Sequence, residues 1–452
     1  ELRDLISSES VSVAEKLNAI KQFNEENTSS MEFVKGDNVS AKRELLSSLF
    51  QFLEGTQLPA DSYAILTTIR LLVREPIGIE SLVDQKNLKI IVQKSQLETD
   101  FSNPEFNECG AEACKCLVNI CIQNEHNEEL YDIFYEVFNL AELCVNALKN
   151  ENLPHCYYFP ILLFFLRVAA RHKRTQVFAK KSNLLIDLLR IVEMLSTSYE
   201  DPVDRMALLD AMSLTLIFSQ HIGPLEECLK PTEEELRAFK KAIPCFQRML
   251  SLPKDNEITS KVVSGVIRCM INVPAECTDD FEHEKTLRDL LEFLVVKLQP
   301  EEEKLVAGDL TPVLLILNSI SKAIRASRVI IKDTLLPGWR EFEPTNNMID
   351  PPKQLEDKST VGYKLLYCMT CSNPGLYHYS AELLFSVCDE DADEFVRIVG
   401  VGKGAGILAN RGLLSSFSSK INRPSVPREI SEEDIEQWNK LMDRLEKHNK
   451  GQ

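Results

Sequence analysis

The chain has 452 residues, of which 44% are hydrophobic and 27% charged, so it can form a folded core and is not a disordered polymer. Its formal net charge of −18 disfavours nucleic acid or an anionic membrane as the main partner, because both repel an acidic surface. The most apolar run, residues 159–168, is about half as long as a membrane-spanning helix. The first residues lack the apolar core of a secretory signal, and we expect a cytoplasmic protein without direct membrane insertion.

Apolar residues recur at helical spacing along most of the chain, whereas alternating strand patterns are missing. Strongly apolar helices are predicted at residues 63–74, 110–123, 158–171, 205–219, 258–272, 310–326, 361–371 and 379–388. More amphipathic segments lie between them, at 41–54, 129–148 and 283–298. One very apolar helix with one or two amphipathic ones, repeated about every 45 to 54 residues, is typical of an armadillo or HEAT solenoid. The pattern predicts an all-α superhelix over residues 1–414.

Most of the apolar helices carry two polar residues four positions apart, which places both on one face of the helix. The pairs are Arg70 and Arg74, Lys115 and Asn119, Arg167 and Arg171, Arg268 and Asn272, and Asn318 and Lys322. The fourth repeat departs from this pattern, with Asp210 and Leu214 at the expected positions. If these helices form the inner layer, the pairs line a basic, asparagine-rich concave groove suited to an extended or helical ligand with carboxylates. Alternatively, they are surface charges, or asparagines bonded to neighbouring loop backbone.

Most of the thirteen cysteines lie inside apolar helical runs, which predicts buried free thiols in a reducing compartment. The clearest cases are Cys114, Cys116, Cys121, Cys144, Cys269, Cys368 and Cys388. Cys368 and Cys371 form a CxxC motif, but neither a βαβ setting nor a second pair of metal ligands accompanies it. We interpret them as two core cysteines one helical turn apart, give the nearby His378 no metal role, and predict no metal or cofactor.

Residues 399–414, VGVGKGAGILANRGLL, have the glycines and lysine of a phosphate-binding loop but not its pattern. Lys403 is followed by Gly404 where the motif needs Ser or Thr, and Arg397 stands where it needs its first glycine. We predict a turn between helices, in which glycine supplies a positive φ.

The end of the chain changes character after Leu414. Residues 415–430 are rich in Ser and Pro and predict a linker. Residues 431–452 predict an amphipathic helix that starts at Ser431 in a capping-box-like sequence. Its apolar face comprises Ile435, Trp438, Leu441, Met442 and Leu445. Because an isolated helix of this length is marginal in water, it must dock on the solenoid or on a partner, and the linker favours a partner.

Five segments resemble, in order, parts of the synembryn family, the resistance-to-inhibitors-of-cholinesterase proteins. They are TTIRLLVRE (67–75), EACKCLVNI (112–120), IRCMINVP (267–274), DLTPVLLILNSISKAIRASRVIIKDTLLP (309–337) and AELLFSVCDEDADEFVRIVGVGKGAGILANRGLL (381–414). The final predicted helix is similar as well. The most specific part is the glycine-rich stretch, which the resemblance identifies as an inter-helix connection of an armadillo-like array.

The resemblance implies a cytosolic, non-catalytic protein that acts on heterotrimeric G-protein α subunits as a folding chaperone and guanine-nucleotide exchange factor. Its partner would be the GDP-bound or nucleotide-free α subunit, whose C-terminal helix the family binds on its concave surface. Residues that match this surface are Arg70, Arg74 and Asn119, with Lys364 as a further candidate. The family's C-terminal helix reaches the nucleotide-binding domain, which suits the apolar face around Trp438. Calcium-sensor proteins are a further candidate partner, and we expect a monomer, with recruitment to the cell cortex left open.

Two departures limit this transfer. The linker is short and rather basic, so Ser425 and Ser431 have no strong claim to the phosphorylation that promotes activity in the family. Leu214 also stands where an asparagine is expected. The alternative is an armadillo-type adaptor that binds another helical or peptide cargo or regulates a small GTPase, because the fold alone does not choose among partners. An enzyme is disfavoured, since the seven histidines are scattered and HExxH and GxSxG motifs are missing.

Overall fold

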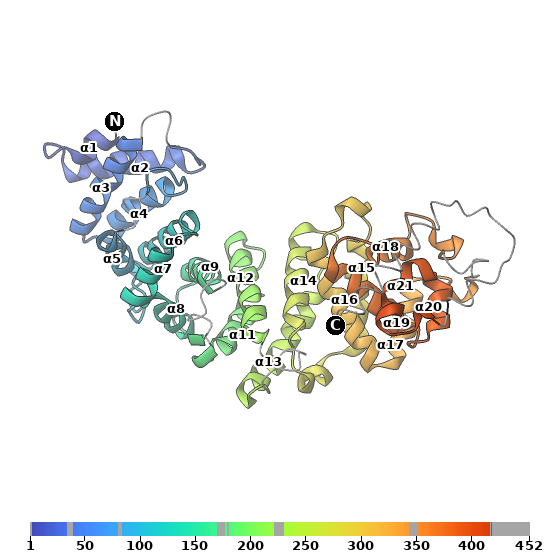
Figure 1. Ribbon diagram of the computed structural model, residues 1–452. Coiled ribbons are helices and arrows are strands. Elements are labelled where there is room, and N and C mark those ends of the chain that lie inside the picture. The colour runs from blue at the N-terminus through green and yellow to red at the C-terminus, as the bar shows by residue number, and fades with distance from the viewer. Residues whose placement is uncertain are drawn as a thin grey trace. The chain divides into compact units, whose positions relative to one another are not determined.

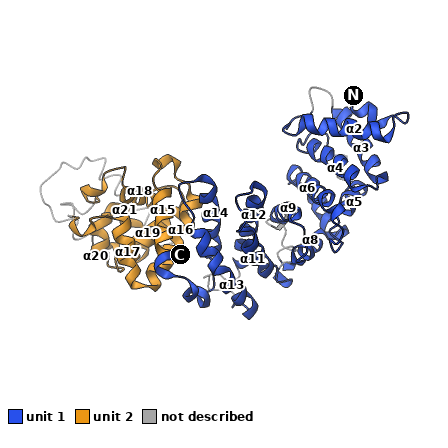
Figure 2. Cartoon of the chain, turned by 180° about the vertical axis from the view of Figure 1, so that it is seen from behind, with its two compact units in different colours: residues 1–286 blue, residues 287–452 orange. Residues whose placement is uncertain are grey.

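The computed structural model describes residues 2–33, 39–79, 84–169, 177–178, 180–220, 230–342, 350–415 and 417. Within these ranges the regular secondary structure is entirely helical (Figure 1), so the prediction of an all-α fold is confirmed. The chain divides into two compact units, residues 1–286 and 287–452, which are coloured separately in Figure 2.

The first unit is built from consecutive α-helices joined by short connections. They are α1 (Leu2–Ser7), α2 (Val13–Asn27), α3 (Val39–Gly55), α4 (Pro59–Leu72), α5 (Gln85–Lys94), α6 (Asn107–Gln123), α7 (Glu128–Asp132), α8 (Leu140–Lys149), α9 (Tyr158–Ala169), α11 (Leu184–Leu195), α12 (Pro202–Ser219), α13 (Glu233–Leu250) and α14 (Glu257–Met270). Single helical turns lie among them, at η2 (Pro104–Phe106), η3 (Ile133–Val137, a π-turn), η4 (His155–Tyr157) and η6 (Ala275–Asp280).

These helices form two rows. The inner row is α2, α4, α6, α9, α12 and α14, and each helix packs on the next one in that order. The outer row is α1, α3, α5, α8, α11 and α13, and each of these packs on the inner helix that follows it in the chain. In Figures 1 and 2 the inner row follows the inner side of the bend within this unit. Two rows of helices stacked in sequence order are the architecture of a helical solenoid.

Local sequence sets where the inner helices begin. The Asp201 side chain accepts hydrogen bonds from the backbone of Val203 and Asp204, and Pro202 occupies the first turn of α12. Asn256 caps α14 in the same way, through the backbone N–H of Ile258. These polar residues fix where each of the two helices begins, and the buried residues that follow pack it against its neighbours.

Three predicted helices end earlier or are divided. The segment predicted at 129–148 consists of α7, a π-turn and α8, with Asn139 in a left-handed conformation at φ 49° before α8. The helix predicted at 310–326 ends at Ala323, because Ile324 adopts extended backbone angles. The helix predicted at 361–371 ends at Cys368, and the next helix begins at Pro374.

The second unit is arranged around one central helix. Most of α15 (His283–Lys297) belongs to this unit, which continues with α16 (Ala307–Ala323), α17 (Arg325–Leu335), α18 (Val361–Cys368), α19 (Pro374–Val387), α20 (Ala392–Val399) and α21 (Val401–Asn410). Single turns lie at η7 (Glu302–Lys304), η8 (Trp339–Glu341) and η9 (Lys353–Leu355). α19 packs on α16, α17, α18, α20 and α21 and so forms the core of this unit.

The glycine-rich stretch is mostly helix, so its prediction as an inter-helix connection is largely wrong. Gly400, at φ 78°, forms the turn between α20 and α21, and Gly412, at φ 70°, follows the end of α21, while the three glycines between them lie inside α21. A Cβ on Gly404 would lie 2.7 Å from the Phe395 ring, and one on Gly406 would lie 1.8 Å from the Tyr377 hydroxyl. These glycines therefore allow α21 to pack closely on α20 and α19.

Every cysteine in the described ranges is a free thiol, and all seven that were predicted to be buried are buried. Burial raises the pKa of Cys144 and Cys368 to about 12, so both thiols stay protonated and unreactive. Cys371 departs from the prediction, because α18 ends at Cys368 and leaves Cys371 partly exposed beyond the helix. Among the described helices, none has the length and apolar character needed to cross a bilayer.

Candidate functional site

A charged cluster joins α4 to α6 on the inner row. The Arg70 Nε donates a hydrogen bond to Glu112, and the Lys115 Nζ lies 3.2 Å from the same carboxylate. The Glu112 side chain is only 1% exposed, whereas Arg70 and Lys115 are 21% and 35% exposed. Glu112 was missed by the sequence reasoning, although its position three residues before Lys115 is the spacing of a helical ion pair.

Arg74 lies one helical turn beyond Arg70. One of its guanidinium nitrogens donates to the backbone carbonyl of Thr28 at 2.7 Å and that of Ser30 at 3.4 Å. Burial lowers the pKa of Arg74, and the positive charge of Arg70 lowers it further. The two arginines therefore repel each other, and this repulsion would be relieved by an anion bound between them.

The amide side chains of α6 hold the end of α4. The Asn119 Nδ2 donates to the Arg70 carbonyl at 3.2 Å, and the Gln123 Nε2 donates to the Arg74 carbonyl at 2.7 Å. Carbonyls at the end of a helix have no partner within that helix. Asn119 therefore caps α4, the preceding inner helix. This is close to the alternative given in the sequence analysis, in which the asparagines bond to neighbouring backbone.

The same capping recurs between α14 and α12. The Cys116 Sγ of α6 donates to the Leu66 carbonyl at 3.3 Å, and the Cys269 Sγ of α14 donates to the Met212 carbonyl at 3.4 Å. Asn272, three residues after Cys269, donates to the Leu216 carbonyl at 3.2 Å, as Asn119 does to that of Arg70. The donors are three residues apart in both α6 and α14, and the accepting carbonyls are four residues apart in both α4 and α12. The pairs α4–α6 and α12–α14 therefore share a common register and can be aligned residue by residue.

This register corrects the reading of the fourth repeat. Leu216 stands at the position of Arg70, and Gln220, four residues on, stands at the position of Arg74. Asp210 and Leu214 are therefore not the members of the row in α12. The fourth repeat keeps an amide at Gln220, and the sequence comparison was out of register by six residues because α12 is apolar on nearly every side.

Asp210 lies at the junction of α12 with α9. It is partly buried, and no described residue forms a hydrogen bond or a close ion pair with it. Burial raises the pKa of Asp210 to about 7, and the positive charge of Arg167 on α9 only partly opposes this shift. Arg167 itself is exposed. Arg171 lies outside the described residues.

The remaining candidates have diverse surroundings. Arg268 on α14 is half-buried, whereas Asn272, Asn318 and Lys364 are buried. The Lys364 Nζ donates to the Pro300 carbonyl, and Lys322 pairs with Glu382 at 3.0 Å. The Asn318 Oδ1 is buried without a hydrogen-bond partner. The first unit brings Arg70, Arg74, Lys115 and Asn119 together, but Asn272, Asn318 and Lys364 do not form a water-exposed stripe. The C-terminal candidates Ile435, Trp438, Leu441, Met442 and Leu445 lie outside the described residues.

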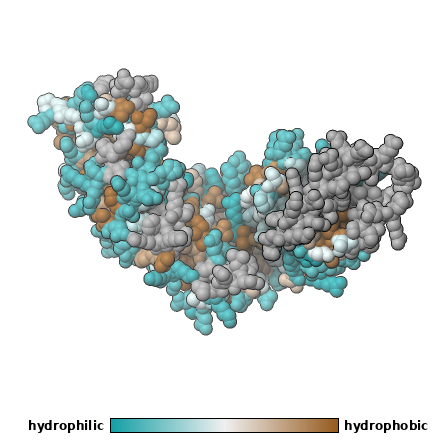
Figure 3. All heavy atoms as spheres, viewed as in Figure 1, coloured by the Kyte–Doolittle hydropathy of each residue, from teal (hydrophilic) through white to brown (hydrophobic). Residues whose placement is uncertain are grey.

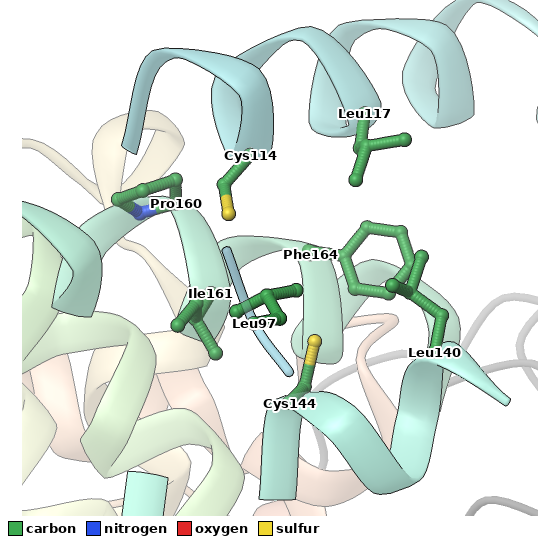
Figure 4. Close-up of a pocket in the computed structure, with 8 residues that line it drawn as sticks. All are labelled: Leu97, Cys114, Leu117, Leu140, Cys144, Pro160, Ile161 and Phe164. Atoms are coloured by element: carbon green, nitrogen blue, oxygen red, sulfur yellow. The ribbon is translucent and has the colours of Figure 1, made fainter. Parts of the chain in front are cut away.

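A small apolar cavity lies where α6, α8 and α9 meet (Figure 4). Its volume is about 10 Å³, and its lining includes Cys114, Cys144 and Phe164. This is room for at most one water molecule, and the lining offers that water no strong hydrogen-bond partner. The cavity is therefore a packing defect and not a ligand site. In the described part of the chain, no group of three or more His, Cys, Asp or Glu side chains is placed to hold a metal ion.

Comparison with known proteins identifies the family. The family profile described as "Guanine nucleotide exchange factor synembryn" matches residues 65–446. Among curated proteins, the chain is 25% identical to "Chaperone Ric-8A" of Gallus gallus, over 92% of this chain and 80% of that protein. It is 24% identical to "Chaperone Ric-8A" of Xenopus tropicalis, over 88% and 77%, and 23% identical to "Chaperone Ric-8B" of Mus musculus, over 88% and 84%. Because the profile covers most of its length, the chain belongs to the synembryn family.

Proposed function

We propose that this protein is a folding chaperone and guanine-nucleotide exchange factor for heterotrimeric G-protein α subunits, and that it acts without a catalytic side chain. The family description and the names of the relatives support the exchange and chaperone roles. The observation that carries the binding mode is the charged cluster of Arg70, Arg74, Lys115 and Glu112 on the inner row. The ligand of this cluster is the C-terminal helix of the α subunit, with its terminal carboxylate.

The charges of the cluster favour an anionic ligand. Three cations and one carboxylate leave a net charge of +2, in a protein whose total charge is −18. Only the Nε of Arg70 bonds to Glu112, which leaves its two terminal nitrogens without a partner among the described residues. A guanidinium presents these nitrogens as a fork that fits a carboxylate. A terminal carboxylate would also relieve the repulsion between Arg70 and Arg74.

Binding and nucleotide release are coupled through the detached helix. In the α subunit, the C-terminal helix braces the nucleotide site, so a protein that prefers the detached helix opposes nucleotide binding by linkage. Accelerating nucleotide loss by about 100-fold needs a differential interaction of about 2.7 kcal/mol. Two or three charge-assisted hydrogen bonds supply a free energy of this size. Rebinding of GTP with Mg²⁺ re-forms the α subunit and expels the solenoid, and the same grip shields an incompletely folded α subunit.

The exchange assay that tests this proposal uses Arg70→Ala/Arg74→Ala. We expect stimulation of GTPγS uptake by a Gα subunit to fall by roughly 100-fold, with a matching loss of affinity. The matched control is Arg237→Ala/Lys241→Ala, which removes two cations from α13 in the outer row and should leave exchange unchanged. Since Arg70 also partners Glu112, Arg74→Ala alone and a thermal unfolding curve separate lost binding from lost folding. Unaltered stimulation by the well-folded double variant would remove the cluster from the mechanism.

A peptide experiment separates this function from that of a general helix-binding adaptor. A synthetic Gα C-terminal peptide with a free carboxylate should bind more tightly than the same peptide with a C-terminal amide, because only the carboxylate accepts paired hydrogen bonds from Arg70 and Arg74. Equal binding of the two peptides would favour the adaptor. The C-terminal segment of this chain, around Trp438, is proposed to contact the nucleotide-binding domain of the α subunit.

A further inference from the structure

The two capped pairs of inner helices differ at one place. The shared register aligns Arg70 with Leu216, and it aligns Glu112 of α6 with Gly265 of α14, because Cys116 matches Cys269 and Asn119 matches Asn272. Both members of the buried ion pair are therefore replaced together. The neighbouring cation is kept, since Lys115 aligns with Arg268.

Gly265, which stands where α6 has Glu112, allows α14 to pack tightly against α12. A Cβ at this position would lie 2.5 Å from the Met212 Sδ, so the methionine fills the space that a larger side chain would need. Leu216 is left half-exposed at the position where Arg70 reaches Glu112. Figure 3 shows hydrophobic residues (brown) among hydrophilic ones (teal) on the described surface of the first unit near α12. At α12–α14, Leu216 and Gly265 thus stand where α4–α6 has its ion pair, and we call this the apolar step, although Arg268 remains beside it; α4–α6 is the cationic step.

We propose that Leu216 is a specificity residue, which receives an apolar side chain of the bound helix while the α4–α6 step holds its carboxyl terminus. This inference rests on the proposed function and adds the direction of the bound helix and the character of its upstream part. The ligand is an amphipathic helix with a free C-terminal carboxylate. Charge complementarity fixes one end of the ligand, and the continuous inner row leads from that end to Leu216.

The spacing of the two steps sets the length of the ligand. Three helix-to-helix steps separate α4 from α12, and packed helices lie about 8–10 Å apart, so the two sites are roughly 24–30 Å apart. A helix rises 1.5 Å per residue, which puts the apolar side chain roughly 16–20 residues before the carboxyl terminus. A short C-terminal peptide reaches only the cationic step.

The test measures binding of two synthetic Gα C-terminal peptides, of about 25 and about 10 residues, by fluorescence anisotropy. Leu216→Arg should weaken the long peptide by roughly tenfold or more, since it places an unpaired charge against an apolar side chain. It should leave the short peptide unaffected, and that unchanged binding also shows that the variant is folded. Leu216→Ala should weaken the long peptide by roughly three- to tenfold. As a control, Met206→Arg adds the same charge at an exposed position nearer the start of α12 and should change neither affinity.

The outcomes separate the two proposals. If Arg70→Ala/Arg74→Ala weakens both peptides but Leu216→Arg weakens neither, the cationic site stands and the apolar step is wrong. If Leu216→Arg weakens both peptides equally, Leu216 supports the fold and does not select the ligand, which also overturns the inference. If Arg70→Ala/Arg74→Ala binds both peptides as tightly as the unmodified protein does, the proposed function fails.

Discussion

The two sides of α6 are held by different chemistry. Towards α4, its side chains bond to three carbonyls in successive turns, through Cys116, Asn119 and Gln123. Towards α9, the described side chains meet through apolar packing, and a small cavity remains between them. The turn before α9 is pinned instead, because the Tyr157 hydroxyl donates to the Ser95 carbonyl at 3.1 Å. Hydrogen bonds to fixed carbonyls allow one register only, whereas apolar contact allows small displacements.

This difference bears on how the cationic step keeps its geometry. Arg70 and Lys115 come from two helices, and they meet at Glu112 only if α4 and α6 keep their register. The turn before α9 reaches α12 only through the exposed His155, whose Nδ1 lies 3.2 Å from the Asp204 carboxylate, and Asp210 is partly buried at this junction without a hydrogen bond to any described residue. The α4–α6 and α12–α14 junctions are therefore fixed by hydrogen bonds to carbonyls, whereas α9 is held mainly by apolar packing, and substitutions around α9 have more room to raise stability.

Removing Glu112 should have the largest effect. Glu112→Ala leaves two partly buried cations facing each other, and we expect the free energy of unfolding to fall by about 3–5 kcal/mol in urea denaturation. The double variant Arg70→Leu/Glu112→Ala should recover most of this loss, because it imitates the apolar step at Leu216. A double variant as unstable as Glu112→Ala would show that the packing of α6, and not the charge balance, sets the stability of this junction.

Neutralising Asp210 should stabilise the protein in a pH-dependent way. The pKa of Asp210 is raised from 3.8 to about 7 in the folded state, so the folded protein holds its proton more tightly than the unfolded chain. Stability from this group is present below pH 4 and is lost as the pH rises towards 7. Asp210→Asn should therefore gain at most about 4 kcal/mol at pH 8 and little at pH 4. Equal gains at both pH values would show that the charge is not the cause.

The two capping asparagines should differ in their effects. Asn272 is buried, so Asn272→Leu removes two hydrogen bonds that water cannot replace, to the Leu216 carbonyl and to the Ser219 hydroxyl, and should lower stability by about 1–3 kcal/mol. Asn119 is half-exposed, so water can replace its amide, and Asn119→Leu should lower stability by about 1 kcal/mol or less. Thermal unfolding of both variants measures the difference. The reverse order would mean that the Arg70 carbonyl is less accessible to water than the exposure of Asn119 suggests.

Helical periodicity alone located the inner helices from α4 to α14 within a few residues, but it did not predict α2. It could not show which neighbour each face meets, and this is where the sequence predictions were incomplete. In α12 apolar residues occur on nearly every side, so Asp210 and Leu214 were taken for the polar pair, and only hydrogen bonds from Asn272 reveal Leu216 and Gln220 as the equivalents. The buried Glu112 escaped for a related reason, since its importance comes from a residue on another helix.

The glycines of α21 teach the same lesson about packing. A run of glycines favours a turn when only local conformation is considered. Here Gly404 and Gly406 are helical, because Phe395 and Tyr377 from neighbouring helices occupy the space beside them. Such long-range contacts are absent from a local sequence pattern, so the family resemblance identified the segment without identifying its structure.

Filling the cavity beside α9 should have the smallest effect. Cys144 lines the cavity from α8, and Cys144→Val adds one methyl-sized group, for which we expect a gain of less than about 1 kcal/mol in urea denaturation. Cys121 is the matched control, because it is fully buried on α6 and does not line the cavity. Cys121→Val should therefore lower stability by about 1–3 kcal/mol through overpacking. If Cys144→Val and Cys121→Val lose stability alike, the space between α6 and α9 is as well packed as the rest of the core. The two sides of α6 would then differ in their hydrogen bonds but not in their packing density.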